Sequence, residues 1–188
     1  AIQSNWLKLK AIGANAAVAG VIKANAYGLG ASKVGNALYA VGCREFFLAS
    51  LDEALAARSF LPADAVIYVL GGIHSGDELL YIDSNLIPVL CSSSSVTAWA
   101  KANIRLGTSA ISAIKVNTGM TRFGLDIYEF ESLCADMDLL RAINPVLLMS
   151  HLACADAHEH PLNQQQLNCF MNCVNLIHQA HAPALSVT

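Results

Sequence analysis

At residues 21–30 the chain reads VIKANAYGLG, an apolar run that ends in Lys23 and passes into a loop punctuated by two glycines. The run belongs to a strand predicted over Val18–Lys23. Desolvation at the end of a buried strand disfavours the ammonium form of lysine and makes its amine available as a nucleophile. Such an amine can form a Schiff base with a carbonyl compound. A lysine whose stem packs on the strand while its charge reaches solvent is the alternative at this point.

Apolar runs of the same kind recur along the chain and alternate with helical stretches. Most of them are continuous, which is typical of strands covered on both faces. Strand–helix repetition predicts a parallel sheet built from right-handed βαβ units. We predict seven strands, at Val18–Lys23, Phe46–Ser50, Val66–Leu70, Leu86–Cys91, Ser112–Asn117, Val146–Ser150 and Ala184–Thr188.

The helices between these strands have recognisable starting points. In a capping box, the first residue and the residue three positions later each satisfy a free backbone N–H of the other. We predict such boxes at Ser50–Glu53, at Asp126–Glu129 and, after Pro161, at Asn163–Gln166. Ahead of the first strand, Ala1–Ala11 is predicted to form an amphipathic helix with Ile2, Trp6 and Leu9 as its apolar residues.

Polar residues and glycines follow the predicted strands directly. A closed (β/α)8 barrel collects the ends of its strands on one rim, where barrel enzymes have their active sites. An open, doubly wound sheet shows the same strand–helix alternation, so periodicity alone leaves both folds open. A barrel requires eight strands, and the chain supplies seven. The residues at the strand ends are Lys23, Ser50, Gly71, Gly72, Ser92, Asn117 and His151.

The composition narrows the class of protein. The 188 residues suit one domain, and 55% hydrophobic with only 13% charged residues excludes a disordered chain. The mean hydropathy is +0.46, yet no run approaches the roughly 18 apolar residues of a membrane-spanning helix. A formal net charge of −3 with scattered Lys and Arg gives no case for nucleic-acid binding. We therefore predict neither a membrane nor a nucleic-acid partner.

The six cysteines lie in apolar or helical stretches, which favours reduced thiols in a cytoplasmic protein over disulfides. Cys169 and Cys173 are four residues apart on a predicted helix, without a second Cys or His pair at zinc-ligand spacing. We predict no metal site. The histidines that complete no recognisable ligand set are His158, His160, His178 and His181.

Residues 21–30 closely resemble the cofactor-attachment motif of alanine racemases, which depend on pyridoxal phosphate. In that family the lysine binds the cofactor as a Schiff base, and the tyrosine hydroxyl reaches the cofactor phosphate. The resemblance implies that Lys23 is the catalytic and cofactor-binding lysine and that Tyr27 contacts the phosphate. It also favours the (β/α)8 barrel over the open sheet.

Residues 115–125, KVNTGMTRFGL, resemble the segment that follows barrel strand five in this family. The family's arginine bonds the cofactor's phenolic oxygen and lies beside the substrate carboxylate, which implies cofactor and substrate binding by Arg122. The lysine seven residues earlier is carbamylated in some members, so Lys115 is a candidate for this modification. Asn117 departs from the aspartate common at its position. On the residues alone, a salt bridge at the rim is the alternative role for Arg122.

Residues 149–156, MSHLACAD, and 161–166, PLNQQQ, are similar to the family's sixth strand end and the helix after it. The matching histidine belongs to the hydrogen-bond network beside the cofactor ring, which implies a supporting, cofactor-binding role for His151. By itself, a lone histidine is more often a satisfied core residue. Gly71, Gly72 and Leu86–Leu90 also match, so the resemblance extends nearly from end to end.

The resemblance implies that residues 1–188 are part of an alanine racemase barrel, with the last strand and a C-terminal β-domain lying outside this sequence. The implied activity is the interconversion of L- and D-alanine, which supplies D-alanine for peptidoglycan, by a cytoplasmic homodimer with pyridoxal phosphate. Lys23 is one base in this mechanism. In the family the opposing base is a tyrosine of the C-terminal domain of the partner subunit.

Two other functions remain open. A serine or broad-spectrum amino-acid racemase is the near neighbour among enzymes. Residues 1–188 by themselves are the other case: without the opposing tyrosine and the main phosphate-binding loops, they are expected to be inactive, a non-catalytic remnant that binds the cofactor weakly.

Overall fold

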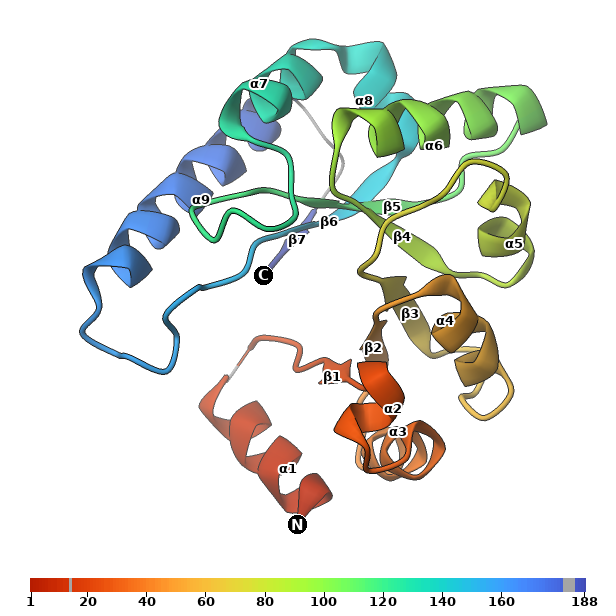
Figure 1. Cartoon of the computed structure of the whole chain (residues 1–188), viewed down its shortest axis with the longest axis vertical. Coiled ribbons are helices and arrows are strands. Elements are labelled where there is room, and N and C mark those ends of the chain that lie inside the picture. The colour runs from red at the N-terminus through yellow and green to blue at the C-terminus, as the bar shows by residue number, and fades with distance from the viewer. Residues whose placement is uncertain (14, 181–184) are drawn as a thin grey trace. The chain divides into compact units, whose positions relative to one another are not determined.

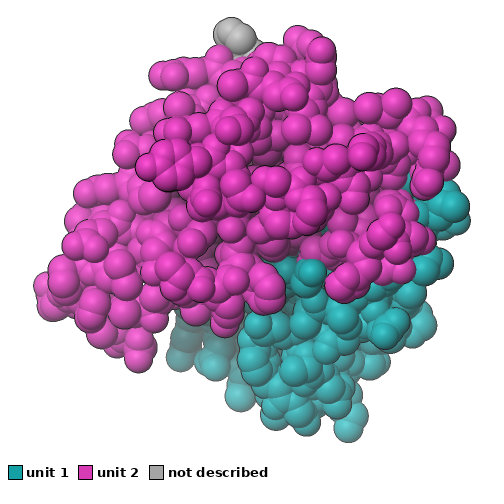
Figure 2. Space-filling model, turned by 45° about the horizontal axis from the view of Figure 1, so that its top comes forward, with its two compact units in different colours: residues 1–71, 79–88 teal, residues 72–78, 89–188 magenta. Residues whose placement is uncertain are grey.

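A computed structural model describes residues 1–13, 15–180 and 185–188. The chain divides into two compact units, one formed by residues 1–71 and 79–88 and the other by residues 72–78 and 89–188 (Figure 2). Figure 1 shows the order of helices and strands along the chain. One strand, β4 (Ile87–Leu90), contributes residues to both units.

Each strand pairs in parallel with the next strand along the chain, so the strand order is the sequence order. A doubly wound sheet reverses its order at a switch point, whereas a (β/α)8 barrel does not. The prediction of an incomplete barrel is confirmed, because the described residues supply seven of its eight strands. These are β1 (Gly20–Val21), β2 (Glu45–Leu48), β3 (Val66–Val69), β4, β5 (Ser112–Lys115), β6 (Pro145–Met149) and β7 (Ser186–Val187).

Most strands are shorter than predicted, whereas β6 has the predicted length but begins and ends one residue earlier. β1 ends at Val21, so Lys23 lies two residues past the strand and opens the turn α2 (Lys23–Tyr27). Ser50 and Asn117 leave the ladder because their side chains bond the backbone of the following segment. All residues of β4 and β5 are buried, as predicted for strands covered on both faces, whereas β7 is exposed. The predicted strand Ala184–Thr188 begins at a residue outside the described ranges.

The first unit contains α1 (Ile2–Ile12), α2, α3 (Ala31–Ala40), α4 (Leu51–Arg58) and most of α5 (Glu78–Asp83). Phe46 and Ile67 are buried in its core, and the rings of Phe47 and Tyr68 stack with centroids 4.6 Å apart. These side chains come from neighbouring strands in register, Phe47 opposite Tyr68. Burial of such aromatic surface is a main source of stability in a small unit.

The predicted apolar face of helix α1 is only partly buried. Trp6 is buried and its indole N–H donates to the carbonyl of Val18 at 2.9 Å, which anchors the helix to the segment before β1. Leu9, predicted on the same face, is 56% exposed. The large indole makes the packing contact for this helix, so a stripe of apolar residues is not buried along its length.

The second unit contains α6 (Ser93–Leu106), α7 (Ile127–Ala135), α8 (Met137–Ile143) and α9 (Pro161–Gln179). Trp99, Phe130 and Leu140 are fully buried there. The buried Asn103 amide donates to the carbonyls of Ala110 and Ala142, at 3.0 and 2.8 Å, and so ties α6 to the segment before β5 and to α8. Within the described ranges, no helix is both long and apolar enough to cross a membrane.

Of the three predicted capping boxes, Asp126–Glu129 is confirmed, with both hydrogen bonds present. At Ser50–Glu53 only half of the box forms: the hydroxyl accepts from the N–H of Glu53, but the carboxylate bonds elsewhere. The box at Asn163–Gln166 is wrong. Helix α9 begins at Pro161 with His160 as its N-cap, because proline suits the first helical position and the imidazole nitrogen accepts from the N–H of Leu162.

Candidate functional site

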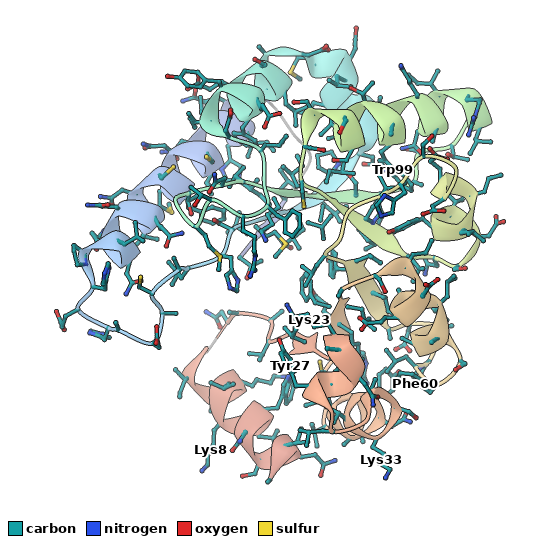
Figure 3. The ribbon with its side chains drawn as sticks, viewed as in Figure 1. Lys8, Lys23, Tyr27, Lys33, Phe60 and Trp99 are labelled. Carbon is teal, nitrogen blue, oxygen red and sulfur yellow. The ribbon has the colours of Figure 1, made fainter. Side chains whose placement is uncertain are left out.

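Lys23 stands where β1 gives way to a left-handed turn (Figure 3). Ala24, Asn25, Ala26 and Tyr27 have φ angles of 51°, 53°, 53° and 54°. A left-handed conformation costs roughly 1–2 kcal/mol for each residue that carries a Cβ. Four such residues in succession form a local structure that needs support from its surroundings, and backbone of this kind occurs preferentially at functional sites.

Most of the support for this turn is local. Ala26 is buried and donates its N–H to the carbonyl of Ile22 at 2.9 Å. The N–H of Gly30 donates to the carbonyl of Asn25, and the side-chain oxygen of Asn25 accepts from the N–H of Ala31 at 2.8 Å. Gly30 has a φ of +92°, which a glycine adopts without strain. The loop therefore closes on itself directly after Tyr27.

The turn leaves the two predicted functional groups accessible. Lys23 is half-buried and makes no hydrogen bond or ion pair with the described residues. Tyr27 is 65% exposed, so its phenol is available to a ligand. A Cβ added to the neighbouring Gly28 would meet no atom within 4 Å, which shows open space on that side of the loop. An amine and a phenol are thus presented together by one short segment.

Glu53 supplies a contact to this turn that sequence reasoning missed. One carboxylate oxygen accepts from the N–H of Ala24 at 2.8 Å, and the other accepts from the N–H of Ala49 at 2.9 Å. Ala24 is the first left-handed residue, and Ala49 directly follows β2. The only signal in the sequence was a glutamate three residues after Ser50, which also fits an ordinary capping box.

In the second unit, the loop after β5 carries Arg122. Val116 and Leu125 form a bridge that closes the base of this loop. The side-chain oxygen of Asn117 accepts from the N–H groups of Gly119 and Thr121, at 3.1 and 2.9 Å. The side chain of Asn117 therefore helps to shape the loop.

Gly124 makes the closure of the same loop sterically possible. Its φ is +130°, and an added Cβ would lie 2.8 Å from the backbone nitrogen of Asn117. The loop holds Arg122 in an exposed position, where its guanidinium forms no hydrogen bond or ion pair with the part of the chain that the structure describes. The rim salt bridge that was the alternative role for Arg122 is not present among these residues.

Lys115 is the last residue of β5 and is 6% exposed. Burial raises the pKa of the neighbouring Cys91 thiol, and the positive charge of Lys115 opposes this shift. A buried ammonium is costly unless it is compensated. Lys115, Asn117 and His151 line one small cavity.

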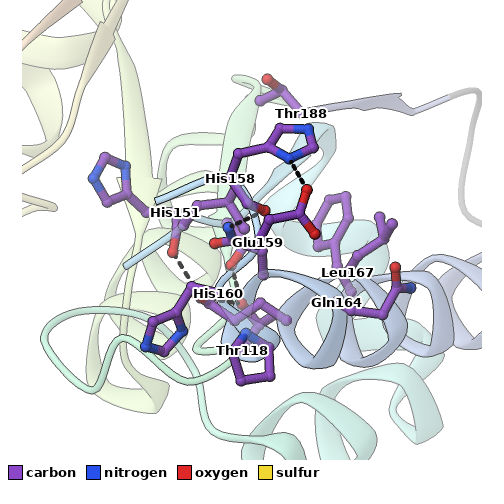
Figure 4. Close-up of a pocket in the computed structure, with 14 residues that line it drawn as sticks. Thr118, His151, His158, Glu159, His160, Gln164, Leu167 and Thr188 are labelled. Carbon is purple, nitrogen blue, oxygen red and sulfur yellow. Dashed lines mark hydrogen bonds and ion pairs between the residues drawn. The ribbon is translucent and has the colours of Figure 1, made fainter. Parts of the chain in front are cut away.

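His151 lies just after β6 and also lines a larger cavity of about 670 Å³ (Figure 4). Gln166 of α9, only 1% exposed, holds the segment around it. Its amide nitrogen donates to the carbonyl of His151 at 2.9 Å and to the hydroxyl of Thr118 at 3.0 Å. Its oxygen accepts from the N–H of Ala153 at 2.9 Å. Gln166 therefore joins the loops after β5 and β6, a role that sequence reasoning missed.

The predicted site residues thus form two sets. Lys23 and Tyr27 share one turn of the first unit. Lys115 and His151 line a common cavity of the second unit, and Arg122 lies on the loop that leaves it. Among the described residues, no group of three His, Cys, Asp or Glu side chains could hold a metal ion. All six cysteines are free.

The family model for the N-terminal domain of alanine racemase matches residues 1–188. The chain therefore belongs to this family. An alanine racemase of Rhodospirillum rubrum is 51% identical over 171 residues, which are 90% of this chain and 46% of that protein. A catabolic alanine racemase of Agrobacterium fabrum is 42% identical over 167 residues, 89% of this chain and 43% of that protein. The chain spans about half the length of these curated relatives.

Solved structures agree with this assignment. The alanine racemase of Bartonella henselae, a structure with covalently bound pyridoxal phosphate, superimposes with a TM-score of 0.92 at 33% identity. The match covers 100% of this chain and 53% of that one. The alanine racemase of Streptomyces coelicolor gives a TM-score of 0.90 at 28% identity, over 97% of this chain and 50% of that one.

Proposed function

We propose that the protein interconverts L- and D-alanine with pyridoxal phosphate as its cofactor, and that residues 1–188 form part of its cofactor-binding barrel. The observation that carries the proposal is the strained turn after β1, which presents the Lys23 amine and the Tyr27 phenol together. Membership of the racemase family and the covalently bound cofactor of the Bartonella henselae enzyme support it.

The donor set fits this cofactor. A primary amine matches its aldehyde, and a phenol and an exposed guanidinium match its anionic oxygens and a substrate carboxylate. When bound, pyridoxal phosphate supplies an electron sink that stabilises negative charge at the Cα of the amino acid. The open space beside Gly28 and the accessible Tyr27 leave room for a ligand on the first unit.

In this proposal, Lys23 holds the cofactor and then moves a proton at Cα on one face of the substrate. Tyr27 binds the phosphate. Arg122 binds the phenolic oxygen and orients the substrate carboxylate through paired N–H bonds, for which its exposed guanidinium is suited. His151 has a supporting role beside the cofactor, and Lys115, when carbamylated, would orient Arg122 as an anion.

The proposal assigns the proton transfer on the opposite face to a tyrosine of the partner subunit, so that the working protein is a homodimer. It further places the enzyme in the cytoplasm, where it would supply D-alanine for peptidoglycan. Family membership supports these parts of the proposal.

The test uses the protein expressed in full from its gene. After incubation with pyridoxal phosphate and reduction with borohydride, peptide mapping is expected to find the label on Lys23, and chiral chromatography is expected to show conversion of both alanine enantiomers. Lys23→Ala should lose the label and reduce turnover by at least about 10³-fold, the usual scale for a lost acid–base group. A label on Lys33 or Lys115, or faster turnover of serine than of alanine, would contradict the assignment.

A further inference from the structure

Glu53, which lies in helix α4, hydrogen-bonds to the turn that carries Lys23. Among the described residues, it is the one side chain from outside residues 22–31 that hydrogen-bonds to this turn. The other backbone bonds of residues 22–31 run within that segment, apart from the strand bond between Ile22 and Phe47 and the helix bond from the N–H of Val34 to the carbonyl of Gly30. The carboxylate thus connects the first left-handed residue, Ala24, to the end of β2.

The geometry suits a carboxylate better than any neutral side chain. Two backbone N–H groups, those of Ala24 and Ala49, donate to the two oxygens at 2.8 and 2.9 Å. A carboxylate offers only acceptors, and hydrogen bonds to a charged acceptor are stronger than neutral ones. An amide at the same position would offer one oxygen. We expect that oxygen to stay on the N–H of Ala49, which is only four residues away along the chain, so that the N–H of Ala24 would face the NH₂ group of the amide.

We propose that Glu53 is a positioning residue, which holds the left-handed turn so that Lys23 and Tyr27 meet the cofactor together. This inference rests on the proposed function and deepens it. Ala24 is bonded to Lys23 along the chain, so its N–H fixes the peptide plane that leaves the lysine. Release of that N–H frees the turn to relax from its left-handed conformation. The amine and the phenol would then no longer be held in fixed positions by one rigid turn.

The competing role for Glu53 is purely structural. Its bond to the N–H of Ala49, and its place in the first turn of α4, would stabilise the junction between β2 and that helix. A structural role predicts a lower melting temperature and faster amide exchange at Ala49, with an unchanged turn at Ala24. A positioning role predicts a local change at Ala24 and weaker cofactor binding.

The experiment compares Glu53→Gln and Glu53→Asp with the control Asp52→Asn in the protein expressed in full. Asp52 is the adjacent exposed carboxylate in the same helical turn, so the control removes an equal charge without touching the turn at Ala24. Hydrogen exchange at the Ala24 amide is measured by NMR without cofactor. We expect it to be about tenfold faster in Glu53→Gln, as for loss of one protecting bond, and unchanged in the control.

The second measurement is the Kd for pyridoxal phosphate, from absorbance titration. We expect about tenfold weaker binding for Glu53→Gln, equivalent to about 1.4 kcal/mol. Glu53→Asp keeps the charge but shortens the reach by one methylene, so its Kd should fall between those of wild type and Glu53→Gln. If Glu53→Gln does not fold, the exchange rate at Ala24 and the Kd are measured on Glu53→Asp instead.

The outcomes separate this inference from the proposed function. Unchanged exchange at Ala24 together with an unchanged Kd overturns the positioning role, even if the wild-type protein binds the cofactor on Lys23. Faster exchange at Ala24 in a protein that binds no pyridoxal phosphate supports the hold on the turn and refutes the proposed function. Faster exchange combined with weaker binding supports both.

Discussion

Arg122 illustrates what one side chain contributes at the residue scale. It lies on a loop shaped by Asn117 and closed at Gly124, and no carboxylate of the described residues pairs with it. A guanidinium that has no hydrogen bond or ion pair with the described residues is available to a ligand. Its planar fork matches carboxylate and phenolate oxygens in a way that a lysine ammonium cannot.

We therefore expect Arg122→Lys to lower kcat/KM for alanine by about 100-fold, close to 2.7 kcal/mol of transition-state stabilisation. The melting temperature should barely change, because Arg122 is exposed and its guanidinium makes no hydrogen bond or ion pair with the described residues. Arg105→Lys, at another exposed arginine of the same unit, is the matched control and should leave both quantities unchanged. Loss of stability with normal turnover would show that Arg122 serves the fold instead.

Residues differ in how far the sequence could predict them. The position of Lys23 followed from a strand end and a long motif, which constrain a residue strongly. Glu53 and Gln166 each stood three residues after a residue predicted to cap a helix, where a long acidic or amide side chain satisfies the cap. Which N–H such a side chain reaches depends on loops from other elements. That information is absent from local spacing, so both roles required the structure.

At the scale of elements, α9 connects the loops after β5 and β6 through Gln166. The side chain is buried and uses both its donor and its acceptor: it contacts Thr118, the carbonyl of His151 and the N–H of Ala153. The hydroxyl of Thr118 continues this network to the hydroxyl of Ser150 at 2.7 Å. The segment that carries His151 is thus held by hydrogen bonds to a helix further along the chain.

Gln166→Met should lower the free energy of unfolding by about 2–3 kcal/mol, because it leaves buried polar groups without partners. Gln165→Met, at the exposed neighbouring glutamine, should change it by less than about 0.5 kcal/mol. Urea unfolding of both variants provides the measurement. Equal stabilities for the two variants would mean that water replaces the lost bonds and that the connection through Gln166 carries no energy.

The strands were predictable in number and order, but less so in length. Seven apolar runs separated by helical stretches were enough for the parallel order, because helical crossovers connect parallel neighbours. The ends of the strands were placed too late, at Lys23 and Ser50 for example, since an apolar pattern continues into residues that already turn away from the ladder. A strand ends where its backbone hydrogen bonds to the neighbouring strand stop, and the hydrophobic pattern of the sequence does not show that position.

For the whole molecule, thiols and a phenol that are buried or half-buried couple the free energy of unfolding to pH. Burial raises the pKa of Cys134 to about 11 and that of Cys173 to about 12, with charged or thiol neighbours adding to the effect. Burial likewise raises the pKa of Tyr68 to about 12, and the pKa of Cys43 also rises. These groups belong to both compact units, so the effect concerns the entire chain.

We expect the free energy of unfolding to fall in alkaline solution. In the unfolded chain these thiols ionise near their ordinary pKa of about 9, whereas in the folded protein they keep their protons to higher pH. The unfolded state therefore binds fewer protons above pH 9, and the free energy of unfolding must fall as pH rises from about 9 toward 12. Urea unfolding at pH 7.5, 9, 10 and 10.5 measures this decline. The double variant Cys134→Ala/Cys173→Ala should have a lower free energy of unfolding at pH 7.5, because packing is lost. Its free energy of unfolding should then fall less steeply with pH than that of the wild type. An equal slope in the variant and the wild type would show that other groups cause the alkaline loss.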